Sequence, residues 1–365
     1  MDKMPRWADI ALVPFINLIL AFFVSGLVVL AIGENPFDMI YFMIKGALGS
    51  TSGIGFTLYY ATNYIFTGLA VAVAFHARLF NIGGEGQAGV AGIGVAVVLL
   101  AVDWPHWTIA MPMAILGGAL FGAAWAAIPA YLQAKRGSHI VVTTIMFNFI
   151  SAALLGYLLN GIMKNPNTQA AETVKFSAGA HLPTAYDVLA PLGIAFSKST
   201  PLNISFPFAL VCAVGVWALL WQTRLGYQIR SFGQSETAAK YAGISGVKVT
   251  IIAMLISGAL AGMLAINVVM GEQERLIKEF VGGAGFVGIA VALMGRSHPF
   301  GIVLAALLFG MLTQGGFELL WEMPQLSKEV VLVIQAMIIL FTGALDNMVR
   351  DPLERFFVRM NRGKT

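Results

Sequence analysis

Residues 224–248 read RLGYQIRSFGQSETAAKYAGISGVK and form a polar stretch between two long apolar runs. The run at 204–223 precedes this stretch and the run at 248–270 follows it, and each has about the 20 residues that a helix needs to cross a bilayer. Charged side chains are costly inside a bilayer, so the polar stretch is expected at a membrane face. The pattern predicts an all-α, polytopic integral membrane protein.

The composition supports a membrane protein. The chain has 365 residues, of which 58% are hydrophobic and only 11% charged, with a mean hydropathy of +0.80. A soluble protein carries about 25% charged residues. The 40 glycines are expected to let membrane helices pack closely. The net charge of +4 does not indicate nucleic-acid binding, because the basic residues are spread between apolar runs. The single cysteine, Cys212, lies in an apolar run and is interpreted as an inert packing residue.

Ten runs are candidate membrane spans. They cover residues 10–32, 56–76, 86–103, 108–132, 139–162, 204–223, 248–270, 283–295, 300–320 and 328–348. The third and eighth are short and glycine-rich, so they are expected to be broken or only partly spanning. The first run is longer than the apolar core of a signal peptide and no Ala-x-Ala site follows it, which favours a retained span.

The basic residues predict the orientation of the chain. With ten spans and both termini in the cytoplasm, most of the 22 basic residues fall in cytoplasmic segments, as the positive-inside rule requires. This topology gives one transmembrane domain over 1–348 and a basic cytoplasmic tail at 349–365. The 224–248 segment is then cytoplasmic, and a proline-containing loop at 163–203 lies outside.

Two glycine motifs suggest an internal repeat. Residues 83–89 and 282–288 share the pattern GGxGxxG, and an apolar run follows each. In the ten-span topology the first motif starts at the cytoplasmic face and the second at the outer face, as in an inverted repeat, where the substrate path lies at the repeat interface. In so glycine-rich a chain, a chance match is the alternative.

The sequence has no pattern typical of an enzyme. Gly84-x-Gly86-x-x-Gly89 matches the dinucleotide fingerprint, but a membrane span precedes it where that motif needs a strand. There is no phosphate-binding loop of the form GxxxxGK[ST], so the chain itself is not expected to hydrolyse ATP. The five histidines are scattered at span ends or in loops. We therefore predict a non-catalytic protein with no cofactor or metal.

Polar residues within the spans are candidates for a solute path. Glu85, at the mouth of the third span, is interpreted either as a latch or path lining, or as a carboxylate stabilised near a helix N-terminus. Amides in spans either hold helices together or face a path, and an aromatic ring beside them would suit a nucleobase or a sugar. The predicted path residues are Asn63, Asn81, Glu85, Gln87, Phe147, Asn148 and Gln335. Few carboxylates lie in mid-span, which argues against a proton-coupled secondary transporter.

The 224–248 segment contains the signals of a short, capped helix. Ser235 is a suitable N-cap, Glu236 lies in the first turn, where the helix dipole favours an anion, and Gly243 can adopt the left-handed conformation that ends a helix. The resulting two-turn helix is predicted to dock a soluble partner, and a solvated connector is the alternative. The predicted docking residues are Gly233, Ser235, Glu236, Ala238, Ala239, Lys240 and Gly243.

Three motifs carry a family resemblance that covers residues 10–348. Residues 226–265 resemble the coupling region of permease subunits of ATP-binding-cassette (ABC) importers for ribose-type sugars, branched-chain amino acids and nucleosides. LFNIGGEGQ at 79–87 and GFVGIAVALMGR at 285–296 are similar to the nucleoside branch, which depends on a basic membrane lipoprotein. Gly84 departs from the alanine expected there. The simple-sugar branch is the next most similar.

The resemblance implies partners and a transport function. Such permeases lie in the bacterial inner membrane and pair with a second, homologous permease, ATPase subunits and an external substrate-binding lipoprotein. ATP is bound by the ATPase subunit, and the cytoplasmic helix transmits its motion to the spans. A nucleoside is the expected solute, and a simple sugar is the first alternative. A self-sufficient secondary transporter is a further alternative, and nucleic acid is not an expected partner.

Overall fold

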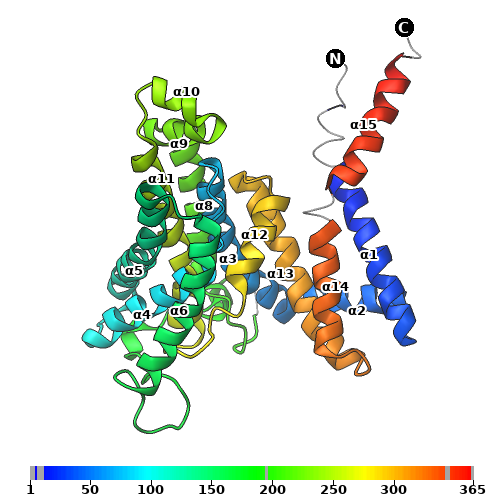
Figure 1. Cartoon of the computed structure of the whole chain (residues 1–365). Coiled ribbons are helices and arrows are strands. Elements are labelled where there is room, and N and C mark those ends of the chain that lie inside the picture. The colour runs from blue at the N-terminus through cyan, green and yellow to red at the C-terminus, as the bar shows by residue number, and fades with distance from the viewer. Residues whose placement is uncertain (1–4, 6–11, 194–195, 342–345, 363–365) are drawn as a thin grey trace. The chain divides into compact units, whose positions relative to one another are not determined.

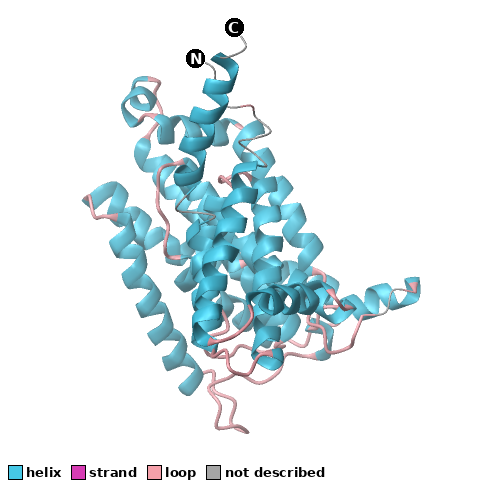
Figure 2. Cartoon of the chain, turned by 90° about the vertical axis from the view of Figure 1, so that its right-hand side faces the viewer, coloured by secondary structure: helices cyan, strands magenta, loops and turns pink. Residues whose placement is uncertain are grey.

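The computed structural model describes residues 5, 12–193, 196–341 and 346–362, and their regular structure is helical (Figures 1 and 2). The helices are α1 (Val13–Ile32), α2 (Pro36–Leu48), α3 (Thr51–His76), α4 (Gly84–Ala101), α5 (Trp107–Arg136), α6 (Ile140–Asn160), α7 (Ala185–Leu189), α8 (Ser205–Gln222), α9 (Arg224–Gln234), α10 (Glu236–Tyr241), α11 (Gly246–Gly262), α12 (Ala284–Met294), α13 (Pro299–Glu322), α14 (Lys328–Ile339) and α15 (Asp346–Arg362). A π-helical segment, η4 (Ile266–Glu272), extends α11, and short 3-10 turns lie at Ala178–Ala180 and Ala190–Leu192. The all-α, polytopic prediction is confirmed.

Eight helical segments in the described part of the chain are long and apolar enough to cross a membrane. They are α1, α3, α4, α5, α6, α8, α11 with η4, and α13. The predicted span at 283–295 is the eleven-residue helix α12, which is too short to cross alone. The predicted span at 328–348 begins as the twelve-residue helix α14, and residues 342–345 lie outside the described residues. The number of ten spans and the side of each terminus remain predictions.

Helix α2 was not predicted from the sequence. Asn35 caps it by accepting a hydrogen bond from the Phe37 N–H at 3.0 Å, Pro36 occupies the first position, and Asp38 lies in the first turn. These are the residues that begin helices. With 13 residues, α2 is too short to span a membrane, so a search for runs of about 20 apolar residues does not find it.

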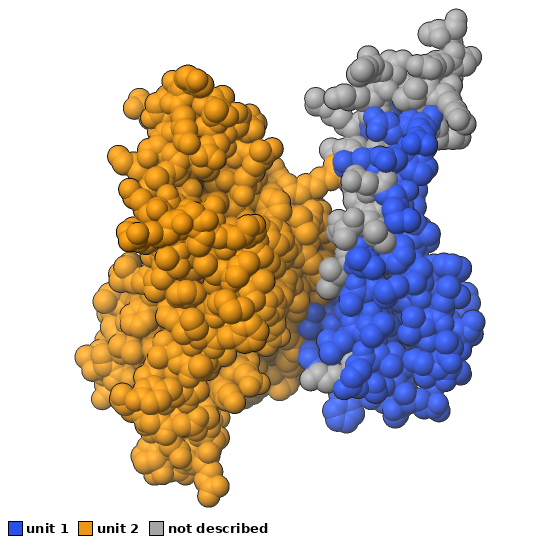
Figure 3. All heavy atoms as spheres, viewed as in Figure 1, with its two compact units in different colours: residues 1–53, 311–365 blue, residues 54–310 orange. Residues whose placement is uncertain are grey.

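The chain divides into two compact units, coloured separately in Figure 3. Unit 1 comprises residues 1–53 and 311–365, and unit 2 comprises residues 54–310. In unit 1, α2 packs on the second half of α13 through glycines. A Cβ on Gly46 would lie 2.3 Å from the Glu318 side chain, and one on Gly315 would lie 2.5 Å from the Met43 carbonyl oxygen. Lys45 and Glu322 form an ion pair between the same helices at 3.2 Å.

Close glycine contacts hold the centre of unit 2. A Cβ on Gly258 of α11 would lie 2.4 Å from the Gly122 carbonyl oxygen of α5. A Cβ on Gly94 of α4 would lie 2.6 Å from the Gly117 carbonyl oxygen of α5. Backbones that approach this closely tolerate no side chain, which is the way that small residues bring membrane helices together. The predicted packing role of the glycines is confirmed at these crossings.

Helix α4 starts inside unit 2. The chain leaves α3 at His76 and turns back into the bundle, where Asn81 donates to Ser257 Oγ at 2.8 Å and Ser257 donates to the Ala70 carbonyl oxygen at 2.6 Å. Ser257 lies three turns beyond the start of α11, or roughly 16 Å at about 1.5 Å a residue. If α11 begins at a membrane face, the start of α4 lies about half-way through a hydrocarbon layer of about 30 Å. Helix α4 itself is unbroken, with 18 residues.

Helix α12 starts beside α4 and runs to the α9 end of unit 2. A Cβ on Gly285 would lie 2.2 Å from the Glu85 backbone nitrogen. Just beyond the other end of α12, His298 packs on Trp221 with ring centroids 5.0 Å apart, and Trp221 packs on His76. The two GGxGxxG motifs therefore meet, and the prediction that they start at opposite faces was wrong. The reason is that a non-helical segment carries the chain into the bundle before each helix begins. The inverted repeat itself remains a prediction.

Candidate functional site

Three hydroxyl side chains cap the helices in and next to the 224–248 segment. Thr223 caps α9 by accepting from the Gly226 N–H at 3.0 Å, Ser235 caps α10 by accepting from the Ala238 N–H at 3.3 Å, and Ser245 caps α11 by accepting from the Lys248 N–H at 3.4 Å. Gly243 has a φ of 77°, so the left-handed turn that ends α10 was predicted at the right residue. The segment also contains the eleven-residue helix α9, which the sequence analysis did not separate from α10.

The segment is anchored on the ends of two membrane helices. A Cβ on Gly233 would lie 2.0 Å from the His76 carbonyl oxygen at the end of α3. Arg230 donates from Nε to the Leu220 carbonyl oxygen of α8 at 3.0 Å, and its guanidinium group lies over the Trp221 ring. Ala239 is buried, with 3% of its surface exposed. Helix α10 is therefore held against the bundle on one side.

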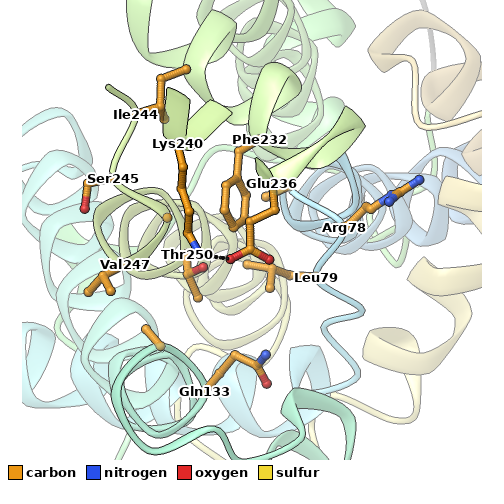
Figure 4. Close-up of a pocket in the computed structure, with 13 residues that line it drawn as sticks. Arg78, Leu79, Gln133, Phe232, Glu236, Lys240, Ile244, Ser245, Val247 and Thr250 are labelled. Atoms are coloured by element: carbon orange, nitrogen blue, oxygen red, sulfur yellow. Dashed lines mark ion pairs between the residues drawn. The ribbon is translucent and has the colours of Figure 1, made fainter. Parts of the chain in front are cut away.

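The other side of α10 is open to solvent. Tyr241 is 93% exposed, and Glu236 and Lys240 form an ion pair at 3.0 Å with more than half of each side chain exposed. A cavity of about 540 Å³ lies beneath this pair. Figure 4 shows Gln133 of α5 across the cavity from the pair and Thr250 of α11 beside it, while the Arg78 side chain turns away. Such an exposed ion pair contributes little to stability.

The predicted docking residues thus lie on one short structural element. Gly233 and Ala239 face the bundle, and Ser235 and Gly243 define where α10 begins and ends. Glu236 and Lys240 are exposed and line the cavity between α10, α5 and α11. Ala238 is exposed on the same helix. Gly233 joins this element to the end of α3, and the turn at 242–245 joins α10 to α11. That this element docks a partner remains a prediction.

Among the predicted path residues, Asn81 and Gln87 form a buried network at the start of α4. The Asn81 Nδ2 donates to Gln87 Oε1 at 2.9 Å, and Asn81 Oδ1 accepts from the Gly83 N–H at 2.9 Å. Gln87 Nε2 donates back to Asn81 Oδ1 at 3.1 Å. Both amides are 1% exposed, and their bonds fix the chain entry into α4.

Glu85 joins the starts of α4 and α12. Its two carboxylate oxygens accept from the Gly283 N–H and the Gly285 N–H, each at 2.9 Å. These N–H groups belong to the first turn of α12, which has no intrahelical partner for them. The interpretation of Glu85 as a carboxylate stabilised at helix N-termini describes this geometry, because a helix start carries partial positive charge.

Asn148 of α6 completes this region. Its Nδ2 donates to the Ile82 carbonyl oxygen at 3.0 Å, and its Oδ1 accepts from the Gly86 N–H at 2.9 Å. Ser151, one turn further along α6, donates to the Gly86 carbonyl oxygen at 2.9 Å. Glu85, Asn148 and Ser151 line a cavity of about 400 Å³.

The other predicted path residues lie elsewhere. Asn63 accepts from Asn267 Nδ2 at 2.9 Å in a separate buried network between α3 and η4. The Phe147 ring packs on Trp125, with centroids 5.2 Å apart. Gln335 belongs to unit 1 and donates to the Leu312 carbonyl oxygen at 3.2 Å. The structure thus brings Asn81, Glu85, Gln87 and Asn148 together around one helix start, and their role in a path remains a prediction.

Two contributors to this region, Ser151 and Ser257, were not predicted from the sequence. Each is buried and bonds a backbone carbonyl of a neighbouring helix. Ser257 precedes Gly258, and Gly262 follows four residues later, so a small-residue face was present as a signal for a helix crossing. Ser151 likewise precedes Ala152, and Gly156 follows Ala152 by four residues, so the same kind of signal was present there.

Comparison with known proteins identifies the chain. Residues 53–343 match the family described as branched-chain amino acid transport system permease component. The chain belongs to this permease family. It is 33% identical to the guanosine ABC transporter permease protein NupP of Bacillus subtilis, over 91% of this chain and 93% of that one. It is 32% identical to the nucleoside ABC transporter permease protein NupB of Lactococcus lactis subsp. cremoris, over 90% of each.

A glucose ABC transporter permease of Haloferax volcanii is similar to the same degree, at 31% identity over 92% of this chain and 88% of that one. The family resemblance drawn from the sequence motifs is confirmed. The chain is a non-catalytic, multi-pass membrane subunit of an ABC transporter, as its relatives are ABC transporter permeases.

Proposed function

We propose that this permease forms the path by which a bacterial ABC importer takes a nucleoside across the inner membrane. The observation that carries the proposal is the α9–α10 element. It lies at one end of unit 2 (Figure 1), presents exposed charges, and packs through Gly233 on the end of α3. The relatives are named ABC transporter permeases, and an element with exposed charges that is attached to the end of α3 supports docking of a partner that hydrolyses ATP.

The proposed orientation puts α9 and α10 in the cytoplasm, together with both termini. The basic residues Arg224, Arg230 and Lys240 lie on this element, and Arg350 and Arg355 lie on α15. Basic residues are retained on the cytoplasmic side of membranes. An ATPase subunit would then meet α10, a substrate-binding lipoprotein would meet the opposite face, and a second, homologous permease would complete the path.

A nucleoside is favoured over a simple sugar as the solute. Two relatives at 32–33% identity are named for guanosine or nucleosides, and one at 31% is named for glucose. Both solutes are uncharged and carry ring hydroxyls, which suits a path with amides and a single partly buried carboxylate at its centre. A simple sugar is the second candidate on the strength of the glucose permease.

The contacts of unit 2 provide a route for coupling. ATP-driven closure of the ATPase pair would displace α10, and Gly233 would pass the motion to the end of α3. Helix α3 is linked to α11 and to the start of α4 through Ala70, Ser257 and Asn81. A shift of α3 would therefore reach Glu85 and open or close access around the start of α4.

Copurification from the native host tests the proposed partners. The tagged permease, solubilised gently, is expected to bring down an ABC ATPase and a second permease, identified by mass spectrometry. Recovery of the folded chain alone would contradict the importer and favour a self-sufficient transporter. That alternative predicts uptake by this chain alone in liposomes, driven by an ion gradient and indifferent to ATP.

A further inference from the structure

A cavity of about 400 Å³ opens between α4, α6 and the segment that leads into α12. Its polar lining includes Glu85, Asn148, Ser151 and Lys278, and Phe286 supplies an aromatic wall. Cavities that bind small molecules usually measure about 300–1,000 Å³ and combine an apolar wall with a few polar groups. This cavity fits that description.

We propose that this cavity holds the nucleoside during its crossing, with Glu85 accepting hydrogen bonds from the two ribose hydroxyls and Phe286 covering the base. The proposal rests on the proposed nucleoside importer and assigns its solute site. The cavity lies where the starts of α4 and α12 meet inside unit 2. Interrupted helices whose ends meet near mid-membrane are where transporters bind their solutes.

The geometry of Glu85 leaves room for a diol. A carboxylate can accept about four hydrogen bonds, two on each oxygen. The Gly283 N–H uses one position on Oε1 and the Gly285 N–H one on Oε2. Each oxygen keeps a free position, and the two hydroxyls of a ribose can donate one bond to each. Recognition of ribose hydroxyls by an acidic side chain is the device that dinucleotide-binding folds use.

The charges around the cavity favour an uncharged solute. The starts of α4 and α12 stabilise the Glu85 carboxylate, and Lys278 lies 3.6 Å from Glu279 in an ion pair. Helix starts inside membrane transporters commonly bind anionic groups of the solute. Here Glu85 already occupies the start of α12, so a phosphate group would meet a negative charge. The site is thus built for a nucleoside and against a nucleotide.

The aromatic wall lies where a base can reach it. Phe286 is in the first turn of α12, one residue after Gly285, and 48% of it is exposed. Ser151 and Ala152 of α6 line the cavity with it. A base stacked on Phe286 would place the ribose toward Glu85, because Phe286 belongs to the first turn of α12 and Glu85 accepts hydrogen bonds from the backbone at the start of that helix.

The first test measures ATP-driven uptake of adenosine and of 2′,3′-dideoxyadenosine by the complete importer in proteoliposomes. The external binding protein is the same for every variant, so a change in the uptake ratio reports on the permease. Glu85→Gln leaves one acceptor oxygen in place of two, and the adenosine-to-dideoxyadenosine ratio is expected to fall at least about tenfold. Glu274→Gln, in a loop outside the cavity, is the control and should keep the ratio.

A second pair of variants does not depend on the capping role of Glu85. Ala152 and Ala153 are adjacent, exposed residues of α6, and only Ala152 lines the cavity. Ala152→Trp is expected to fill the cavity and stop uptake of both nucleosides, while Ala153→Trp transports them, with both variants assembled at wild-type levels.

The outcomes separate this inference from the proposed function. Wild-type uptake of adenosine, with an unchanged ratio in Glu85→Gln or normal transport by Ala152→Trp, would overturn the cavity as the solute site and leave the nucleoside importer standing. A wild-type complex that takes up no nucleoside would overturn the proposed function and the site with it.

Discussion

At the scale of single residues, close backbone contacts identify glycines at which a larger side chain is poorly tolerated. Gly233 touches the His76 carbonyl oxygen, Gly258 touches Gly122, and Gly285 touches the backbone of Glu85. Each contact joins segments that are far apart in the sequence. A methyl group at any of them must move a backbone rather than a flexible side chain, so these positions are more sensitive than their surroundings.

Gly233→Ala is expected to uncouple ATP hydrolysis from transport. Overpacking of this kind costs about 1–3 kcal/mol, and here it pushes α9 away from the end of α3. We expect nucleoside uptake to fall at least about tenfold while the assembled complex still hydrolyses ATP. Gly215→Ala, on α8, is the control, because a Cβ there meets nothing within 4 Å. Equal uptake by the two variants would show that the Gly233 contact transmits nothing.

Gly258→Ala is expected to loosen the crossing of α5 and α11. The new methyl group would lie 2.4 Å from the Gly122 carbonyl oxygen, and we expect a loss of about 1–3 kcal/mol in the free energy of unfolding. Thermal unfolding in detergent measures it. Gly156→Ala, on α6 with nothing within 4 Å, should be neutral or slightly stabilising because alanine favours helices. A Gly258→Ala protein as stable as Gly156→Ala would contradict this packing.

At the scale of elements, the groups at the starts of helices determine where the short helices form and which helices meet. The starts of α4 and α12 meet around the Glu85 carboxylate, and α9, α10 and α11 each begin at a capping hydroxyl. A capped start fixes where a short helix begins even without a long apolar face. Helix α10 has only six residues, so its cap and the buried Ala239 determine whether it forms.

Ala239→Pro is expected to abolish uptake without removing the permease from the membrane. Proline within a helix costs about 3 kcal/mol or more, which a six-residue helix cannot absorb, so α10 would lose its shape. Uptake assays and membrane fractionation check both parts. Thr237→Ala, exposed on the same helix, is the control. Normal transport by Ala239→Pro would mean that α10 has no part in coupling.

At the scale of the whole molecule, local signals were predictable and long-range contacts were not. Ser235 and Gly243 mark the bounds of α10 within nine residues of sequence, so their roles could be read directly. Helix α2 was not predicted because its 13 residues are too few to be recognised as a membrane span. The contact of Glu85 with Gly283 joins residues almost 200 positions apart, and periodicity carries no information about such a pair. The two glycine motifs could be found in the sequence, but their contact with each other could not be predicted from it.

The proposed function requires that this permease conduct a nucleoside when a partner hydrolyses ATP. The most direct measurement is guanosine uptake into proteoliposomes that contain the copurified complex and its external binding protein, with and without ATP. Accumulation of guanosine is expected to require ATP and to be lost in Ala239→Pro. Uptake that proceeds without ATP, or an ATP-hydrolysing complex that accumulates glucose and no nucleoside, would contradict it.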